Sequence, residues 1–206
     1  MTGTRGGGYA KGRERRGAIL EAANDLFAAQ GFHGTSLASI ATRVGLSEPG
    51  LLHHFPSKEH LLLDLLALRH DHDAERVARA LAHHEGFLDA LLGLCRENQD
   101  TPGLVRLFAV LAAESVDDDH PAHEWMVARY RSLRERFATR IANEQREGRI
   151  AMGIDPHVLA PQLIAMFDGL QVQWLLEPDA VDMSAIFADF LDRLRPPAAG
   201  VRPQRG

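Results

Sequence analysis

Apolar residues recur at steps of three and four along most of the chain, which is the spacing of one face of an α-helix. The first such face spans residues 13–30, and Gly31 is placed to end the helix in the left-handed conformation. A shorter helix follows, with Thr35 or Ser36 as its N-cap, and Gly45 ends it. The pattern contains no credible strand, so it predicts an all-α protein.

The third predicted helix, residues 48–54, is short and begins with unusual residues. Ser47 is its expected N-cap, and Pro49 falls in the first turn, where a proline removes no helical hydrogen bond. Glu48 faces the positive end of the helix dipole, and Pro56 ends the helix. A short turn containing a glycine joins the second and third helices, which is the spacing of a helix-turn-helix motif.

Six further helices are expected downstream, with residues 58–83, 86–98, 103–116, 121–148, 156–177 and 183–194. The fold class is therefore an all-α, three-helix head at residues 13–57, followed by a six-helix body at residues 58–195. Residues 1–12 are expected to form a disordered basic arm, because this stretch is mostly Gly, Thr and Arg with little to bury, and residues 196–206 a disordered tail.

Composition and charge narrow the class of protein. The 206 residues are 45% hydrophobic and 25% charged, which is ordinary for a soluble protein. There is no membrane-length apolar run and no apolar core for a signal peptide, so we expect a cytoplasmic protein. The net charge is −5, but it is unevenly distributed. Residues 1–60 carry seven Lys or Arg and five acidic residues, whereas the rest of the chain carries sixteen Lys or Arg and twenty-three acidic residues. A basic head on an acidic body is typical of a DNA-reading head with a body that does not touch DNA.

Several short motifs in the head resemble one known family. Ile40-Ala41, Gly45-Leu46-Ser47 and the run HHFPSKE at residues 53–59 are similar to the DNA-binding domain of the TetR family of transcriptional regulators, over about residues 13–62. The resemblance implies a homodimer that binds a palindromic operator in double-stranded DNA. It also implies that a small-molecule effector releases a repressor from that operator.

The resemblance and the motif together give a set of candidate DNA-binding residues. They are Thr35, Ser36, Arg43, Ser47, Glu48, Gly50, Leu51, His53, His54 and Lys58. By the resemblance, Thr35, Ser47 and Lys58 lie near phosphates, and Phe55 is a core residue. His53 and His54 point about 100° apart on a helix, so one can reach DNA while the other packs or contacts a phosphate.

Three positions in the third helix depart from the family pattern. Where Glu48 stands the family often has Lys, where Gly50 stands it often has Thr or Ser, and where Leu52 stands it often has Tyr. Each change removes a possible phosphate donor, and phosphate contacts supply much of the affinity for DNA. An alternative function is therefore a helical ligand-sensing or protein-interaction module with a weakened DNA head.

The eighth predicted helix is apolar on more than one side, so it must be covered all round, and the ninth adds further apolar residues. Pairing with their copies in a second subunit would cover them in a four-helix interface, as the family does. The alternative is a monomer whose eighth helix is central. The candidate dimer residues are Leu163, Phe167, Leu170, Trp174, Phe187, Phe190, Leu191 and Leu194.

A ligand site in the body is implied by the family resemblance. Aromatic residues, a methionine and a few polar groups suit a largely apolar effector with one or two hydrogen-bonding ends. The candidates are Phe108, Trp125, Met126, Tyr130, Phe167, Asp168, Gln171 and Trp174. Asp168 and Gln171 stand out because burying them without partners would be costly, while any of the set can equally be ordinary core.

No pattern in the chain indicates a metal site, a cofactor or catalysis. His120 and His123 lie near acidic residues, but neither they nor His70 and His72 have the spacing of a zinc motif. Cys95 lies in an apolar helix without an adjacent base, and there is no phosphate-binding glycine loop. We therefore expect no enzyme activity, no cofactor and no metal.

Overall fold

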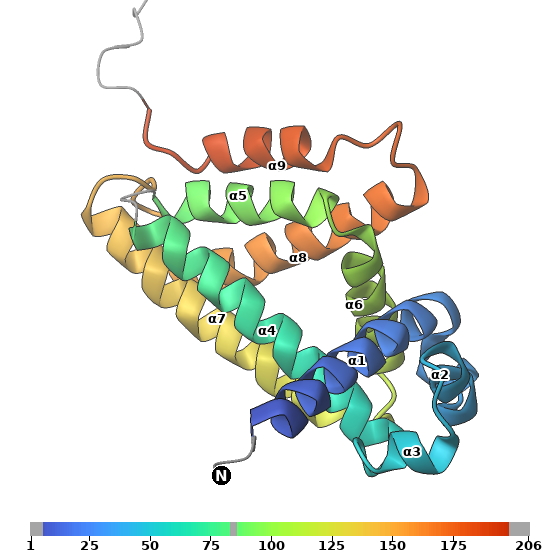
Figure 1. Cartoon of the computed structure of the whole chain (residues 1–206). Helices are drawn as coiled ribbons and strands as arrows, with labels where there is room; N and C mark the ends of the chain where they lie inside the picture. The colour runs from blue at the N-terminus through green and yellow to red at the C-terminus, as the bar shows by residue number, and fades with distance from the viewer. Residues whose placement is uncertain (1–5, 83–85, 198–206) are drawn as a thin grey trace, which may run out of the picture. The chain divides into compact units, whose positions relative to one another are not determined.

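The computed structural model describes residues 6–82 and 86–197, and these residues form α-helices with no strand between them (Figure 1). The predicted all-α fold class is confirmed. The helices are α1 Gly6–Gly34, α2 Leu37–Arg43, α3 Glu48–Leu52, α4 Lys58–Ala82, α5 Phe87–Gln99, α6 Pro102–Glu114, α7 His123–Arg146, α8 Pro156–Leu176 and α9 Met183–Asp192. None of the described helices is long and apolar enough to cross a membrane.

The described residues form two compact units. Unit 1 contains the described residues up to His72 together with Thr101–Met126, and unit 2 contains those of Asp73–Asp100 and from Val127 onward. Unit 1 thus holds α1, α2, α3 and α6 with the start of α4, whereas unit 2 holds α5, α8 and α9 with most of α7. The head and body boundary expected at residue 57 stays a prediction.

Unit 1 is built on the apolar face of α1. Ile19, Ala23 and Phe27 recur at steps of four and are fully buried, as this spacing predicts. α2 and α3 lie next to α1 and to each other (Figure 1). α6 packs across α1, and its buried residues are Val105, Leu107, Phe108 and Leu111. Phe55 is fully buried between these elements, which confirms its predicted place in the core.

Serine caps and glycine turns fix the helix-turn-helix. The Ser36 side chain accepts a hydrogen bond from the Ser39 amide, and the Ser47 side chain accepts one from the Gly50 amide. Gly31 and Gly45 both have positive φ, at 70° and 67°, as helix-ending glycines require. The short loop between α2 and α3 therefore has a defined geometry.

Several predicted boundaries need correction. Residues 6–12 were expected to be disordered but continue α1, while residues 1–5 lie outside the described residues. The first helix runs to Gly34 with a kink at Gly31, because the backbone resumes helical turns after that one residue. α3 ends at Leu52 rather than at residue 54. The tail prediction falls almost wholly on residues 198–206, which lie outside the described residues, as does His83.

Unit 2 is a packed group of long helices in which α9 lies along α5 and α8 (Figure 1). Phe87, Leu163 and Phe187 are fully or almost fully buried in it. A buried carboxylate, Glu144, accepts two hydrogen bonds of 2.7 Å from the guanidinium of Arg149, which satisfies its charge.

Candidate functional site

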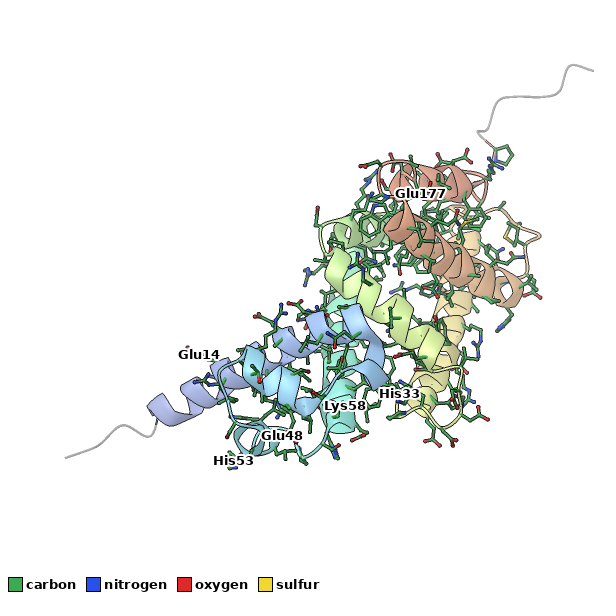
Figure 2. The ribbon with its side chains drawn as sticks, turned by 90° about the vertical axis from the view of Figure 1, so that its right-hand side faces the viewer. Glu14, His33, Glu48, His53, Lys58 and Glu177 are labelled. Carbon is green, nitrogen blue, oxygen red and sulfur yellow. The ribbon has the colours of Figure 1, made fainter. Side chains whose placement is uncertain are left out.

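α3 presents a small, mixed surface to solvent. Glu48 and His53 are exposed, and Figure 2 shows both at the outer edge of unit 1. Leu52 is 37% exposed and His54 is half-buried. Leu51 was expected to contact DNA, but its side chain is 0% exposed because it faces the core of unit 1. Of the three candidates at the end of α3, Leu51 is thus buried and His54 half-buried, whereas His53, the C-cap, is exposed.

The start of α3 is shaped by its cap. Ser47 accepts from the Gly50 amide at 3.2 Å, and a β-carbon at Gly50 would lie 3.2 Å from the Ser47 hydroxyl oxygen. A larger residue at position 50 would therefore press on the capping hydroxyl. The Glu48 carboxylate sits in the first turn, where the helix dipole favours it.

Two of the residues expected to lie near phosphates are used inside unit 1. The ammonium group of Lys58 donates to the carbonyls of Phe32 and Thr35, at 2.8 and 2.9 Å, and lies 4.2 Å from the centre of the Phe32 ring. Thr35 is 1% exposed, and its hydroxyl donates to the Gly31 carbonyl at 2.9 Å. The Thr35 side chain is thus a core group, and Lys58 primarily ties α4 to the end of α1.

Ser36 and Arg43 place polar groups on the outer side of α2. Ser36 is exposed and caps the helix, and the exposed Arg43 guanidinium pairs with Asp25 of α1 at 2.9 Å. Because both members of this pair are about half exposed, the pair is weak. Ser36, Arg43, Ser47, Glu48 and His53 form one set of exposed side chains, which we call the reading surface.

Sequence reasoning missed the part played by Arg16 of α1. The Arg16 guanidinium donates to the His54 carbonyl at 2.7 Å, forms an ion pair with Asp64 and lies 4.1 Å from the centre of the Phe55 ring. It thereby fixes the end of α3 to both α1 and α4. The partners are 38 to 48 residues away in sequence, so no local pattern could have identified them.

The candidate ligand residues fall in both units. Phe108 and Met126 are buried in unit 1, where Trp125 is half-buried. The other five belong to unit 2, and their positions are Tyr130, Phe167, Asp168, Gln171 and Trp174. Gln171 and Trp174 are buried, and the Phe167 ring packs edge-on against a neighbouring ring of α9.

Tyr130 and Asp168 form the most unusual polar pair of unit 2. The Tyr130 hydroxyl donates to the Asp168 carboxylate at 2.8 Å. Burial raises the pKa of Asp168 above its ordinary value, although the Tyr130 hydrogen bond and the charge of Arg129 oppose this. Burial and the neighbouring carboxylate likewise raise the pKa of Tyr130. An acid held in apolar surroundings at reach of a hydroxyl is a natural partner for a polar group on a ligand.

The outer side of α8 and α9 carries an open apolar groove of about 530 Å³. Its lining residues are Gln162, Ala165, Met166, Gly169, Leu170, Gln173 and Phe190. Of the candidate dimer residues only Leu170 and Phe190 are among them. Leu163, Phe187 and Leu191 are almost fully buried by their own chain, so their side chains are core and not surface. Periodicity marked α8 as apolar all round but could not tell which face its own subunit covers.

Nucleophilic and metal-binding groups are sparse. Among the residues that the structure describes, no three His, Cys, Asp or Glu side chains come together as a metal site would require. Burial raises the pKa of the Cys95 thiol to about 12, so this thiol is not a nucleophile near neutral pH.

Sequence profiles of two protein families match the chain, one over each part. Residues 19–65 match the family described as bacterial regulatory proteins, tetR family. Residues 83–196 match the C-terminal domain of BetI-type transcriptional repressors. The first match covers the helix-turn-helix and the second covers most of the remaining chain.

Known proteins and structures agree with the profiles. The chain is 30% identical to the HTH-type transcriptional regulator TtgR of Pseudomonas putida over 183 residues, which cover 83% of this chain and 85% of that protein. A TetR transcriptional regulator from Chloroflexus aurantiacus superimposes with a TM-score of 0.76 at 28% identity, covering 89% of this chain and 95% of that one. A transcriptional regulator from Saccharomonospora viridis, solved in complex with choline, superimposes with a TM-score of 0.73 at 26% identity, covering 87% of this chain and 96% of that one.

Proposed function

Because the chain belongs to the TetR family of transcriptional regulators and is not an enzyme, we propose that it is a cytoplasmic repressor that binds a palindromic operator as a homodimer and leaves it when a small effector binds. The observation that carries this proposal is the reading surface on α2 and α3. Its five exposed side chains are held by two serine caps and by Arg16 in a fixed helix-turn-helix. A second helix held in this way is the element that enters the major groove of DNA.

Each part of the reading surface has a distinct proposed role. His53 contacts a base edge, because it is the exposed side chain at the C-terminal end of α3. Ser36, Ser47 and Arg43 contact phosphates from the loop and helix ends on either side. His54 is half-buried, and its carbonyl accepts a hydrogen bond from Arg16. Its ring packs edge-on against the His53 ring at a centroid distance of 5.8 Å. The Lys58 ammonium donates two of its three hydrogens to carbonyls, and the third can bind a phosphate.

The groove on α8 and α9 is the proposed dimer interface. It is apolar, open and flanked by exposed apolar side chains of the same two helices, Val158, Val172 and Ile186. Exposed apolar surface of this kind marks an interaction site, and a two-fold axis would place the same patch of both subunits together. Ala165 and Gly169 have small side chains, which permit close approach of two copies of α8. A two-fold dimer presents two copies of α3, so the operator is proposed to be a palindrome.

The effector site is proposed to include Tyr130 and Asp168. This part-buried pair joins α7 to α8, and the carboxylate offers an acceptor to a hydrogen-bonding or cationic end of a largely apolar molecule. The choline held by the S. viridis regulator is one small molecule with a cationic end. We propose the chemical class on this basis and not choline itself.

Selection of bound sequences from a random duplex pool tests the repressor function. Purified protein is expected to enrich a palindrome, and its affinity for that duplex should fall by about one power of salt concentration per phosphate contact. Loss of enrichment at low salt would contradict the proposal. It would favour the alternative of a ligand-sensing or protein-interaction module, which is kept open by Glu48 on the reading surface and by the internal use of Thr35 and Lys58.

A further inference from the structure

The end of α1 after its kink, together with Thr35, is held by charged side chains of two other helices, and we call this segment, residues 31–35, the turn. From α6, the Glu114 carboxylate accepts a hydrogen bond of 2.9 Å from the Phe32 amide. From α4, the Lys58 ammonium donates to the Phe32 and Thr35 carbonyls. Figure 2 labels Lys58 and His33 close together in this region of unit 1. The turn leads directly into Ser36, the cap of α2, so its geometry sets the start of the helix-turn-helix.

The Glu114 carboxylate lies directly against the backbone of Gly31. Its φ of 70° is one that L-residues with a side chain rarely adopt, and a β-carbon there would lie 2.2 Å from Glu114 Oε1. Glycine is therefore required twice at this position, for the backbone conformation and for the approach of the carboxylate. α6 and α1 are therefore joined at this point by a specific contact between the Glu114 carboxylate and the backbone of residues 31 and 32.

A second donor faces the same carboxylate. The His120 side chain is 1% exposed, and its Nδ1 accepts a hydrogen bond from the Ala122 amide at 3.2 Å. Because Nδ1 accepts from an amide, the ring proton is on Nε2, and the Ser115 hydroxyl 3.1 Å from Nδ1 also acts as a donor. Nε2 lies 3.8 Å from Glu114 Oε2 and has no hydrogen-bond partner among the described residues.

These contacts give the Glu114 carboxylate two possible donors, one bonded and one not. A shift of the carboxylate by about 1 Å toward His120 would bring Nε2–H within hydrogen-bond distance. The buried donor that is now unsatisfied would gain a partner, and the bond that the same oxygen accepts from the Phe32 amide would lengthen. Two discrete arrangements of one group are what a switch between helices requires.

We propose that Glu114 is the positioning residue through which α6 fixes the DNA-reading helices, and that its carboxylate passes from the Phe32 amide to His120 Nε2–H when the operator is released. This inference rests on the proposed function, since it concerns how operator affinity is set. In the state described, the carboxylate holds the turn and the helix-turn-helix is ordered for DNA. After transfer, the turn keeps its bonds from Lys58 and its internal bond from Thr35 to Gly31 but loses its tie to α6, and the reading surface is free to reorient.

The test compares carboxylate variants of unit 1 on the selected operator. Glu114→Ala removes the acceptor, and we expect the operator Kd to rise about tenfold, since a bond to a charged group is worth at least one factor of ten. Glu114→Gln keeps an oxygen that can accept from Phe32, so a smaller rise is expected. Asp119→Asn removes an equal charge from an exposed position near α6 and is expected to change the Kd less than twofold. Equal Kd values for all three variants would overturn the proposal.

Hydrogen exchange of the Phe32 amide gives a readout that loss of stability alone would not produce. Glu114→Ala should speed exchange at this amide while distant core amides remain protected. His120→Asn keeps an acceptor in place of Nδ1 but removes the second donor, so exchange at Phe32 should become slower. Unchanged exchange in Glu114→Ala would overturn the positioning role, and unchanged exchange in His120→Asn would overturn the transfer.

The two readouts separate this inference from the proposed function. If the wild-type chain binds no duplex, the proposed repressor function fails while the exchange measurements still decide the role of Glu114. If the wild-type chain binds its operator and Glu114→Ala binds it equally well, the repressor function stands and the inference fails.

Discussion

Burial raises the pKa of Asp168 in unit 2, where its carboxylate accepts a hydrogen bond from Tyr130 at 2.8 Å. A carboxyl with a raised pKa keeps its proton in the folded chain at a pH where the unfolded chain has lost it. Raising the pH through this window therefore favours the unfolded state. A polar group on an effector would relieve the cost of the buried charge, which is why such residues mark binding sites.

Replacing Asp168 with Asn tests this reasoning. The free energy of unfolding of the wild-type protein should decrease as the pH rises above 3.8, the ordinary pKa of the group. The decrease should stop once the pH has passed the raised pKa of Asp168 in the folded chain. Asp168→Asn stays neutral and can still accept from Tyr130, so its stability relative to wild type should grow across that window. Urea unfolding of both proteins between pH 4 and 8 measures the difference. A difference that does not change with pH would contradict the buried-acid account.

Gly31 and Gly45 form a matched pair of glycines with positive φ. A β-carbon at Gly45 meets nothing within 4 Å, whereas one at Gly31 meets the Glu114 carboxylate. We expect Gly45→Ala to cost about 1 kcal/mol for the left-handed backbone and Gly31→Ala to cost about 2–4 kcal/mol. Urea unfolding measures both costs. The additional cost of Gly31→Ala should shrink in the Glu114→Ala background, and strict additivity would rule out the predicted contact.

At the scale of elements, α3 is short but tightly specified. Its cap, its first-turn proline and its glycine junction with α2 are all local features, and they were predictable from sequence. The ties from Arg16 and Lys58 were not, since they join residues 23 to 48 positions apart. Helical periodicity likewise marked Leu51 as part of α3, but which side faces DNA depends on where α1 lies. Long-range packing therefore decides the site, while local chemistry decides the helices.

His53 is expected to determine which base is preferred at one operator position. Replacing His53 with Ala should cost about 1–3 kcal/mol on the preferred duplex and relax the preference at that position. His72→Ala provides the control, because His72 is exposed and lies about 20 Å along α4 from its first residue. Anisotropy titrations on duplexes that vary at single positions give both values. An equal loss on every duplex would show that His53 contacts the backbone and not a base.

At the scale of the whole molecule, the two units hold different candidate sites. Unit 1 carries the reading surface, and unit 2 carries the α8–α9 groove and the Tyr130–Asp168 pair. The sequence predicted a DNA-reading head from its charge distribution and a dimer interface from its apolar eighth helix. It could not assign ligand residues to one site, because residues similar in type are distributed over both units.

The groove should control assembly. Ala165→Arg places a charge in the apolar groove and is expected to yield monomers, with operator affinity reduced by at least tenfold because one half-site is lost. Ala78→Arg adds the same charge at an exposed position of α4 outside the groove and should remain dimeric. Sedimentation velocity distinguishes the two outcomes. A dimeric Ala165→Arg protein with full operator affinity would place the interface elsewhere.

Titration of the selected duplex against a scrambled duplex of the same composition, at several salt concentrations, tests the central claim of sequence-specific DNA binding most directly. We expect the selected duplex to bind about 10³-fold or more tightly than the scrambled one at physiological salt. Both affinities should fall steeply as salt rises. Equal affinity for the two duplexes at every salt concentration would contradict a reading helix in this chain.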